Sequence, residues 1–319
     1  MQPHPTLGPR AGYASVAIAA VLWGTFSLFF RPAERMSRAL LAPATEAFAV
    51  FAVVFVVTAP FAWRQGRMLG RRPARGWAAV AFTGVGDALN ALLFFWAMQT
   101  TSLSIAVLSH YLAPVLVALA APVFLGERMK RATWIALALA LTGLGLLLEP
   151  WRAGTSARAA LAGAALGAGS AFFYATNMIV FKRVQHLFLP LEVLAWHMPT
   201  ALLVLFLCVP RGGFSLEPQV AGLLAAAGLI PGALAGVLFL RGLARVPASR
   251  ASVFTLLEPL VAVGIGVLVW GEKPTLVAAF GASLVLSGAW LVLKSETPEA
   301  VLNMVSTQPS VVETGTRAE

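Results

Sequence analysis

The sequence is built from long uncharged apolar runs separated by short polar stretches. The runs are roughly 17–23 residues long, a length that as α-helix matches the ~30 Å hydrocarbon core of a bilayer. They lack the alternation of apolar and polar residues that is typical of β-strands. Lipid offers no partner to an unpaired backbone group, so only helices or closed barrels cross it. We therefore predict an all-α integral membrane protein.

The composition excludes a soluble globular domain. Of 319 residues, 59% are hydrophobic and only 11% are charged, and the mean hydropathy is +0.82. Soluble domains carry roughly 25% charged residues. The formal net charge of +10 would suit a nucleic-acid-binding protein. However, the basic residues lie between the apolar runs and not on one face, so membrane topology explains them better. We expect a lipid bilayer, and no nucleic acid, as a partner.

Polar and charged breaks divide the chain into ten predicted spans. The first is uncharged and too long for the apolar core of a typical signal peptide, so we expect it to be retained. A short tail, 1–11, precedes it, and the polar tail 294–319 is expected to be disordered. The predicted spans are 12–30, 41–63, 76–98, 103–124, 131–149, 159–181, 190–209, 218–240, 248–270 and 275–293.

The distribution of basic residues predicts the orientation of these spans. With the N-terminus in the cytoplasm, 16 of the 23 Lys and Arg residues fall in cytoplasmic segments and 7 in the opposite ones. Cytoplasmic loops are enriched in these residues. Arg31, Arg35 and Arg38 oppose the trend. We expect a multi-pass protein of a bacterial-type inner membrane with both termini in the cytoplasm.

The second half of the chain repeats the first at a constant offset of 145 residues. Residues 94–148 aligned with 239–293 contain twelve identities in 55 ungapped positions. Matched pairs include Pro114 with Pro259, Gly126-Glu127 with Gly271-Glu272, Gly143 with Gly288, Ser104 with Ser249, Ala106 with Ala251 and, outside that window, Gly24 with Gly169.

This repeat predicts two units of five spans, 12–149 and 159–293. Because five is odd, the second unit must cross the membrane in the opposite sense, which gives an inverted repeat. Two halves related in this way can adopt each other's conformation, as alternating-access transporters do. Inverted repeats also occur in channels, so the symmetry favours a transporter without excluding a pore.

Several short motifs resemble those of the drug/metabolite transporter superfamily, EamA type, over residues 12–293. The resemblance implies ten helices in two inverted halves, a central cavity, and export or exchange of amino acids, their derivatives or other small solutes. Many relatives have an arginine early in the second span, where this chain has Thr45-Glu46. The motifs are Val21-Leu22-Trp23-Gly24, Ser104-Ile105-Ala106, Leu112-Ala113-Pro114, Leu125-Gly126-Glu127-Arg128, Leu257-Glu258-Pro259 and Trp270-Gly271-Glu272-Lys273.

Three acids fall within predicted spans, where a charged side chain costs roughly 2.5–3.5 kcal/mol at a helix centre. Asp87 lies midway along the third span, and Asn90 shares its face one turn on. This pair predicts a polar cavity wall or a protonatable site; the alternative is an Asp–Asn contact that joins helices. Glu46, in the second span, and Glu258, before the kink-forming Pro259, predict substrate or proton coupling, with structural pairing to a basic residue as the alternative.

Further polar and aromatic side chains in the spans are candidates for lining a site between the two halves. Each is weighed against ordinary packing, since a lone intramembrane His is usually a hydrogen-bonded core residue and a Trp commonly packs. The candidates are His110, Tyr111, Tyr174, Asn177, His197, Trp23 and Trp96. By contrast, Glu127 and Glu272 lie at span ends, where we expect them to cap helices or to pair with Arg128 and Lys273.

No metal or cofactor is expected. The four histidines lack metal-ligand spacing, and Cys208 is the only cysteine. The P-loop spacing of primary pumps and the His-Glu-x-x-His of metalloproteases are both absent. Together with the resemblance above, these absences lead us to expect a secondary transporter that exports small organic metabolites, such as amino acids, by alternating access, driven by the solute's own gradient or by protons. The alternatives are a membrane enzyme acting on lipid-linked substrates and a channel.

Overall fold

The computed structural model describes residues 9–37, 41–66, 72–214 and 216–295. These residues form helices and connections with no strand among them. Ten helical segments are long and apolar enough to cross a membrane. The prediction of an all-α, ten-span membrane protein is therefore confirmed. The predicted tails, except for residues 9–11, 294 and 295, lie outside the described residues.

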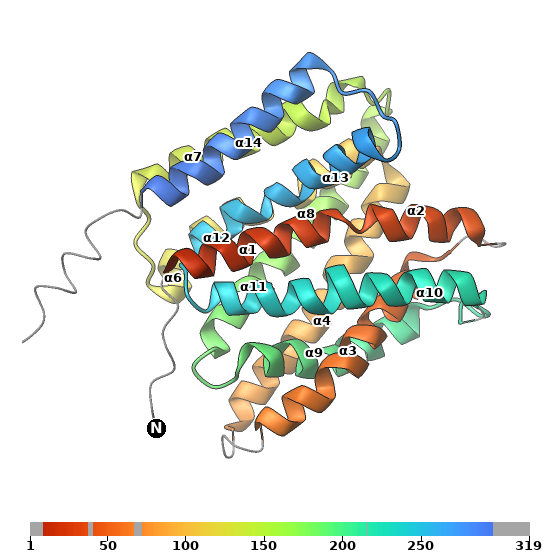
Figure 1. Ribbon diagram of the computed structural model, residues 1–319, viewed down its shortest axis with the longest axis vertical. Coiled ribbons are helices and arrows are strands. Elements are labelled where there is room, and N and C mark those ends of the chain that lie inside the picture. Colours follow the sequence, from red (N-terminus) through yellow and green to blue (C-terminus); the bar gives the residue numbers. More distant parts are fainter. Residues whose placement is uncertain (1–8, 38–40, 67–71, 215, 296–319) are drawn as a thin grey trace, which may run out of the picture.

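The first five spans are made of seven helices, and a 3-10 turn η1 (Pro150–Arg152) follows them (Figure 1). These helices are α1 (Pro9–Gly24), α2 (Ser27–Met36), α3 (Pro43–Gly66), α4 (Ala74–Thr100), α5 (Leu103–His110), α6 (Ala113–Leu125) and α7 (Arg131–Leu148).

The last five spans contain seven α-helices and one π-helical segment, η2. In order they are α8 (Ala157–Val184), α9 (Pro190–Cys208), α10 (Pro218–Ala227), η2 (Gly228–Leu234), α11 (Ala235–Leu243), α12 (Ala248–Thr255), α13 (Leu257–Leu268) and α14 (Leu276–Lys294).

The span bounds agree with the predicted ones to within a few residues, but four spans are interrupted. The kink permitted by Pro259 appears as a break at Leu256, three residues earlier, because proline displaces the carbonyl one turn back. The equivalent break before Pro114 and the π segment around Pro231 were not predicted. The break in the first span was not predicted either. At this break the Thr25 hydroxyl donates a hydrogen bond to the Leu22 carbonyl oxygen at 2.6 Å.

Two of the broken spans, the fourth and the ninth, correspond to each other at the offset of 145 residues found in the sequence. Helix α12 begins and ends 145 residues after α5, and α14 begins 145 residues after α7. Gly126 and Gly271, which follow these spans, both adopt left-handed backbone, with φ of 67° and 71°. Glycine has no Cβ to oppose that conformation. Gly126 is the C-cap of α6, whereas α13 already ends at Leu268, three residues before Gly271.

Large apolar side chains cover the outside of the bundle, as expected for a surface that meets lipid. Leu276 is 91% exposed, Leu268 85% and Val123 77%. The main interior cluster joins residues from both halves of the chain. Val117 and Leu144 come from the first half, and Met178, Leu240 and Leu256 come from the second.

Helices α7 and α14 lie side by side at one edge of the bundle (Figure 1). Glycines bring their backbones together. A Cβ built on Gly143 would be 2.6 Å from the carbonyl oxygen of Gly281, and one built on Gly288 would be 2.6 Å from that of Ala136. Such contacts let dispersion and weak Cα–H bonds act between helices in lipid.

We predict that Gly143→Ala weakens this packing. The added methyl group forces the two backbones apart, at a cost of about 1–3 kcal/mol in the free energy of unfolding. Thermal unfolding in detergent should show a lower midpoint. Gly145→Ala is the matched control, because a Cβ there meets nothing within 4 Å, and it should leave the midpoint unchanged or raise it. Equal midpoints for the two variants would contradict this account of the contact.

Candidate functional site

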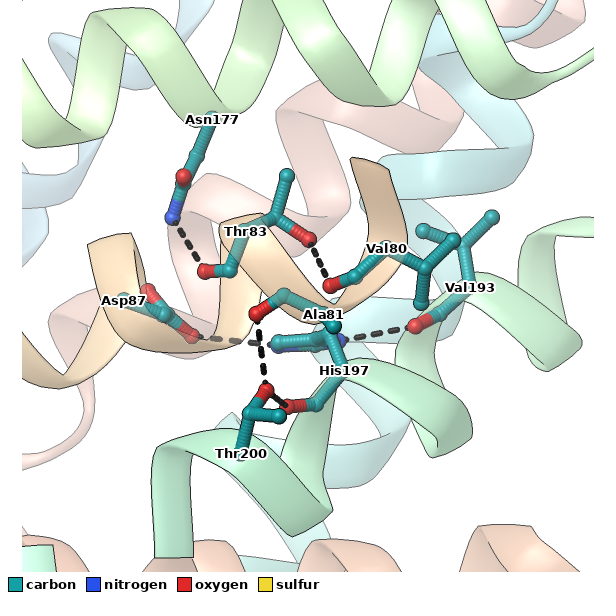
Figure 2. Close-up of polar contacts among 8 residues, drawn as sticks. All are labelled: Val80, Ala81, Thr83, Asp87, Asn177, Val193, His197 and Thr200. Atoms are coloured by element: carbon teal, nitrogen blue, oxygen red, sulfur yellow. Dashed lines mark hydrogen bonds and ion pairs between the residues drawn. The ribbon is translucent and has the colours of Figure 1, made fainter. Parts of the chain in front are cut away.

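The carboxylate of Asp87 meets the imidazole of His197 between helices α4 and α9 (Figure 2). Asp87 lies midway along α4 and His197 in the first half of α9. The Oδ2 atom of Asp87 is 3.2 Å from Nε2 of His197. The side chain of His197 is 2% exposed and that of Asp87 is 26% exposed. The histidine is thus a fixed interior group, while the acid keeps one side accessible.

The hydrogen bonds of His197 indicate the tautomer of its ring. Its Nδ1 atom is 2.8 Å from the carbonyl oxygen of Val193, one turn back in α9. A carbonyl only accepts, so Nδ1 carries a proton and donates it. A hydrogen bond across the 3.2 Å contact between Nε2 and Oδ2 then needs one extra proton, beyond those of a carboxylate and a neutral histidine.

Polar contacts on either side of this pair hold three helices in place (Figure 2). Asn177 of α8 donates to the Thr83 carbonyl of α4 at 3.0 Å. Thr200 of α9 donates to the Ala81 carbonyl at 2.8 Å. Gly86 allows the first contact, because a Cβ there would be 2.4 Å from the Asn177 side-chain oxygen. These bonds fix the faces that α8 and α9 present to Asp87.

A second polar group links His110 to Asn90 through Ser170. His110 Nδ1 is 2.8 Å from the Ser170 hydroxyl, which contacts the Asn90 backbone and side-chain oxygens at 2.9 and 2.8 Å. Because the Ser170 proton goes to Asn90, His110 donates to Ser170. Asp87 and Asn90 contact different helices: Asp87 contacts His197 of α9, and Asn90 contacts Ser170 of α8. Each side chain thus also joins α4 to a neighbouring helix, which is the structural alternative considered above.

A third group surrounds Glu258 at the break between α12 and α13. Its carboxylate lies within interaction distance of the Tyr111 hydroxyl, which stands at the equivalent break between α5 and α6. Tyr174 of α8 also interacts electrostatically with Glu258 and with Asp87. The Tyr174 ring packs edge-on against His110, with centroids 5.5 Å apart. This packing joins the second and third groups. We name Asp87, Asn90, His110, Tyr111, Ser170, Tyr174, Asn177, His197 and Glu258 the polar cluster.

Three candidates lie outside the polar cluster. Glu46 is 3% exposed, and within the described part of the chain its Oε1 has no hydrogen-bond partner. It interacts electrostatically with Glu34, another acid. Trp96 is 60% exposed and makes no ring contact among the described residues. Trp23 packs against Phe239, with ring centroids 5.0 Å apart. Ordinary packing accounts for Trp23, as considered above.

Ser170 is the member of the cluster that sequence reasoning missed. It is fully buried and bridges His110 and Asn90 through its hydroxyl. A serine in a span rich in Gly and Ala carries little signal by itself. The useful sign is its register: Ser170 lies four residues before Tyr174, which places both on one face of α8.

The polar cluster offers carboxylates, imidazoles and hydroxyls but no basic side chain in ion-pair contact with Glu258 among the described residues. No group of three or more His, Cys, Asp or Glu residues in the described ranges could hold a metal ion. The arrangement can bind and pass protons and can form hydrogen bonds to a polar solute.

The comparisons with known proteins bear on both halves of the chain. Residues 10–149 and 161–294 each match the EamA-like transporter family. A protein of Archaeoglobus fulgidus named as an uncharacterized transporter is 31% identical over 287 residues, which cover 88% of this chain and 97% of the relative.

Other relatives carry more specific names. Protein RarD of Salmonella typhi is 25% identical over 271 residues, covering 83% of this chain and 88% of RarD. A riboflavin transporter of Rhizobium johnstonii is 28% identical over 298 residues, covering 88% and 93%.

A solved crystal structure shares the fold. It superposes with a TM-score of 0.75 over 94% of this chain and 99% of its own, at 20% sequence identity. The family match spans nearly all of the ten helical spans described above. The chain belongs to the EamA-like transporter family of multi-pass membrane proteins.

Proposed function

We propose that this chain is a secondary transporter that exports small organic metabolites, such as amino acids or related compounds, by alternating access. The observation that carries the proposal is the 3.2 Å contact between Asp87 and His197, two ionisable side chains within helices of a ten-span bundle. Substrate binds beside the polar cluster, and two five-helix halves, 12–149 and 159–293, move around it as an inverted repeat.

The cost of placing acids in a membrane supports this use of the cluster. A carboxylate at a helix centre costs roughly 2.5–3.5 kcal/mol, so two of them in one cluster indicate a function. If these two positions served only to pack helices together, apolar side chains would suffice. The cluster also draws on both proposed halves: Asp87, Asn90 and Tyr111 come from the first, and Tyr174, His197 and Glu258 from the second.

Proton coupling follows from the extra proton of the Asp87–His197 pair. Release of that proton leaves a carboxylate facing an imidazole lone pair, and the contact between α4 and α9 weakens. A solute that competes for the Asp87 carboxylate would therefore displace a proton. This exchange links the solute gradient to the proton gradient across the inner membrane, with both termini of the chain in the cytoplasm, as the Lys and Arg distribution indicates.

An enzyme of lipid-linked substrates and a channel are the competing functions. Transporter names among the relatives favour carriage of solute. Ser170 contacts His110 but directs its proton to Asn90, so this contact does not supply the base-activated nucleophile that such an enzyme needs.

Counterflow in proteoliposomes tests the transport function. Vesicles loaded with unlabelled amino acids should take up labelled members of the same panel faster than empty vesicles, with an initial rate that saturates. Riboflavin forms a separate arm, because one relative is named for it. Uptake of riboflavin alone would correct the substrate class. Rates that rise linearly with concentration would identify a channel, and no exchange in either arm would contradict the proposal.

Two variants separate substrate transport from proton coupling. Asp87→Asn removes the acid, so we expect it to abolish exchange while insertion and expression stay normal. His197→Gln keeps a donor to Asp87 but cannot titrate. We expect exchange within about threefold of wild type but no accumulation driven by a pH gradient. The exposed acid variant Glu34→Gln is the control and should match wild type in both assays. Normal exchange by Asp87→Asn would overturn the site assignment.

A further inference from the structure

The carboxylate of Glu127 caps the first turn of a helix in the other half of the chain. Glu127 follows α6, and its Oε1 accepts from the Ala248 backbone N–H at 2.6 Å. Its Oε2 accepts from the Ser249 backbone N–H at 3.0 Å and from the Ser249 hydroxyl at 2.7 Å. Free N–H groups and the helix dipole both favour a carboxylate at this position. The contact ties the end of α6 to the start of α12.

The helix it caps cannot cap itself. The residue before α12 is Pro247, which has no side-chain acceptor. The equivalent helix α5 begins after Ser102, whose hydroxyl accepts from the Ile105 N–H at 3.3 Å. The cap on α12 is therefore supplied from the other half, while α5 carries its own.

Every part of this contact has an equivalent at the offset of 145 residues. Glu127 corresponds to Glu272, Ser249 to Ser104 and Ala248 to Leu103. Helices α6 and α12 meet at the left of Figure 1, whereas the connection between α13 and α14 lies at the right. We name these the Glu127 end and the Glu272 end. The same set of groups is thus present at both ends of the bundle.

At the Glu272 end the equivalent contact is not made. Glu272 Oε1 instead pairs with Arg31 of α2 at 2.7 Å, and its carboxylate lies over Gly266 of α13, the helix that precedes it. Arg31 and Arg35 both contact the face of Trp270, at 5.5 and 5.2 Å from the ring centroid. Helix α6 packs against α12, but α13 and α5 show no comparable packing among the described residues.

A lysine reinforces closure at the Glu127 end. Lys182, near the end of α8, donates to the carbonyl oxygens of Leu243 and Val246 at 2.5 and 2.8 Å. It also interacts electrostatically with Glu127. Its repeat equivalent is Ser37, which is too short to reach across in this way. The Glu127 end is therefore held by more than one polar contact.

We propose that Glu127 and Glu272 are alternating latches. In the present state Glu127 caps α12 and closes its end of the bundle. In the opposite state Glu127 releases α12, and Glu272 leaves Arg31 to accept from the Leu103 and Ser104 N–H groups and the Ser104 hydroxyl of α5. The two ends exchange one set of hydrogen bonds for its repeat equivalent. The proposal rests on the alternating access put forward above.

Distances between paired spin labels test the latches without a substrate. The Cys208→Ser background carries Arg128→Cys with Ala244→Cys at the Glu127 end, or Gln99→Cys with Lys273→Cys at the Glu272 end, in lipid nanodiscs. All four label sites are exposed. Wild type should give two distances for each pair, with the long distance at one end accompanying the short one at the other.

Removing either charge should shift these populations in opposite directions. Glu127→Gln leaves one neutral acceptor facing three donors, so the open-to-closed ratio at the Glu127 end should rise at least about fivefold, as charged hydrogen bonds exceed neutral ones. Glu272→Gln should shift the ratio the other way. Shifts of the same sign, or none while wild type shows both distances, would overturn the latches alone. A single unchanging distance at both ends would overturn alternating access as well.

A pair of matched serine variants removes the ambiguity of a folding defect. Ser249→Ala deletes a bond present in this structure and should open the Glu127 end. Ser104→Ala deletes a bond formed only in the opposite state and should favour the present one. Both substitutions remove one hydroxyl at equivalent positions, so a general loss of stability would move both ratios alike. Like-signed shifts would contradict the proposal.

Discussion

Lipid leaves backbone hydrogen bonds with no external partner, and this constraint governs where the bundle can be interrupted. The fourth and ninth spans break before Pro114 and Pro259, and each break lies inside the bundle. Tyr111 at one break is buried and interacts with Glu258 at the other. The two breaks thus add one side chain from each half to the polar cluster. Its other links, such as Asp87 with His197, are made between the unbroken helices α4, α8 and α9.

The two halves of the chain share corresponding helices, but the polar residues differ at equivalent positions. Gly86-Asp87 corresponds to Pro231-Gly232 in the π segment η2, where a Cβ on Gly232 would meet Val54 at 2.8 Å. The contact between α4 and α9 is thus polar, whereas its equivalent between η2 and α3 is apolar and tight. In the transport cycle proposed above, a proton site in only one of the two contacts would give the two halves a single coupling centre.

At the proposed latches, by contrast, the two halves have the same residues. Glu127 and Glu272 are equivalent, and so are Ser104 and Ser249. The surroundings of the two glutamates differ. Pro247 gives α12 no side-chain cap of its own, and Arg31 forms an ion pair with Glu272. Such small differences decide which state is more stable when two arrangements are built from the same groups.

The sequence predicted the helical class, the span positions and the kink at Pro259, because apolar length and proline act locally. It selected Asp87 and His197 separately, since a buried ionisable group is unusual wherever it lies. Their pairing depends on how α9 rotates against α4, which no local pattern records. Glu46 satisfied the same criterion yet lies apart from the polar cluster.

The sequence also did not predict side-chain contacts between segments that lie far apart in the chain. Glu127 was expected to cap a helix or to pair with its neighbour Arg128, but the helix it caps is 121 residues away. The links made by Ser170 and by Arg31 likewise join segments that meet only in the folded bundle.

The central claim is that the two five-helix units face opposite ways across the membrane. It is tested most directly with a membrane-impermeant maleimide on sealed vesicles that carry single cysteines in the Cys208→Ser background. Arg128→Cys and Lys273→Cys occupy equivalent, exposed positions at the offset of 145 residues. The account predicts that they label from opposite sides of the vesicle. Labelling of both from the same side would contradict the inverted repeat and the transport cycle built on it.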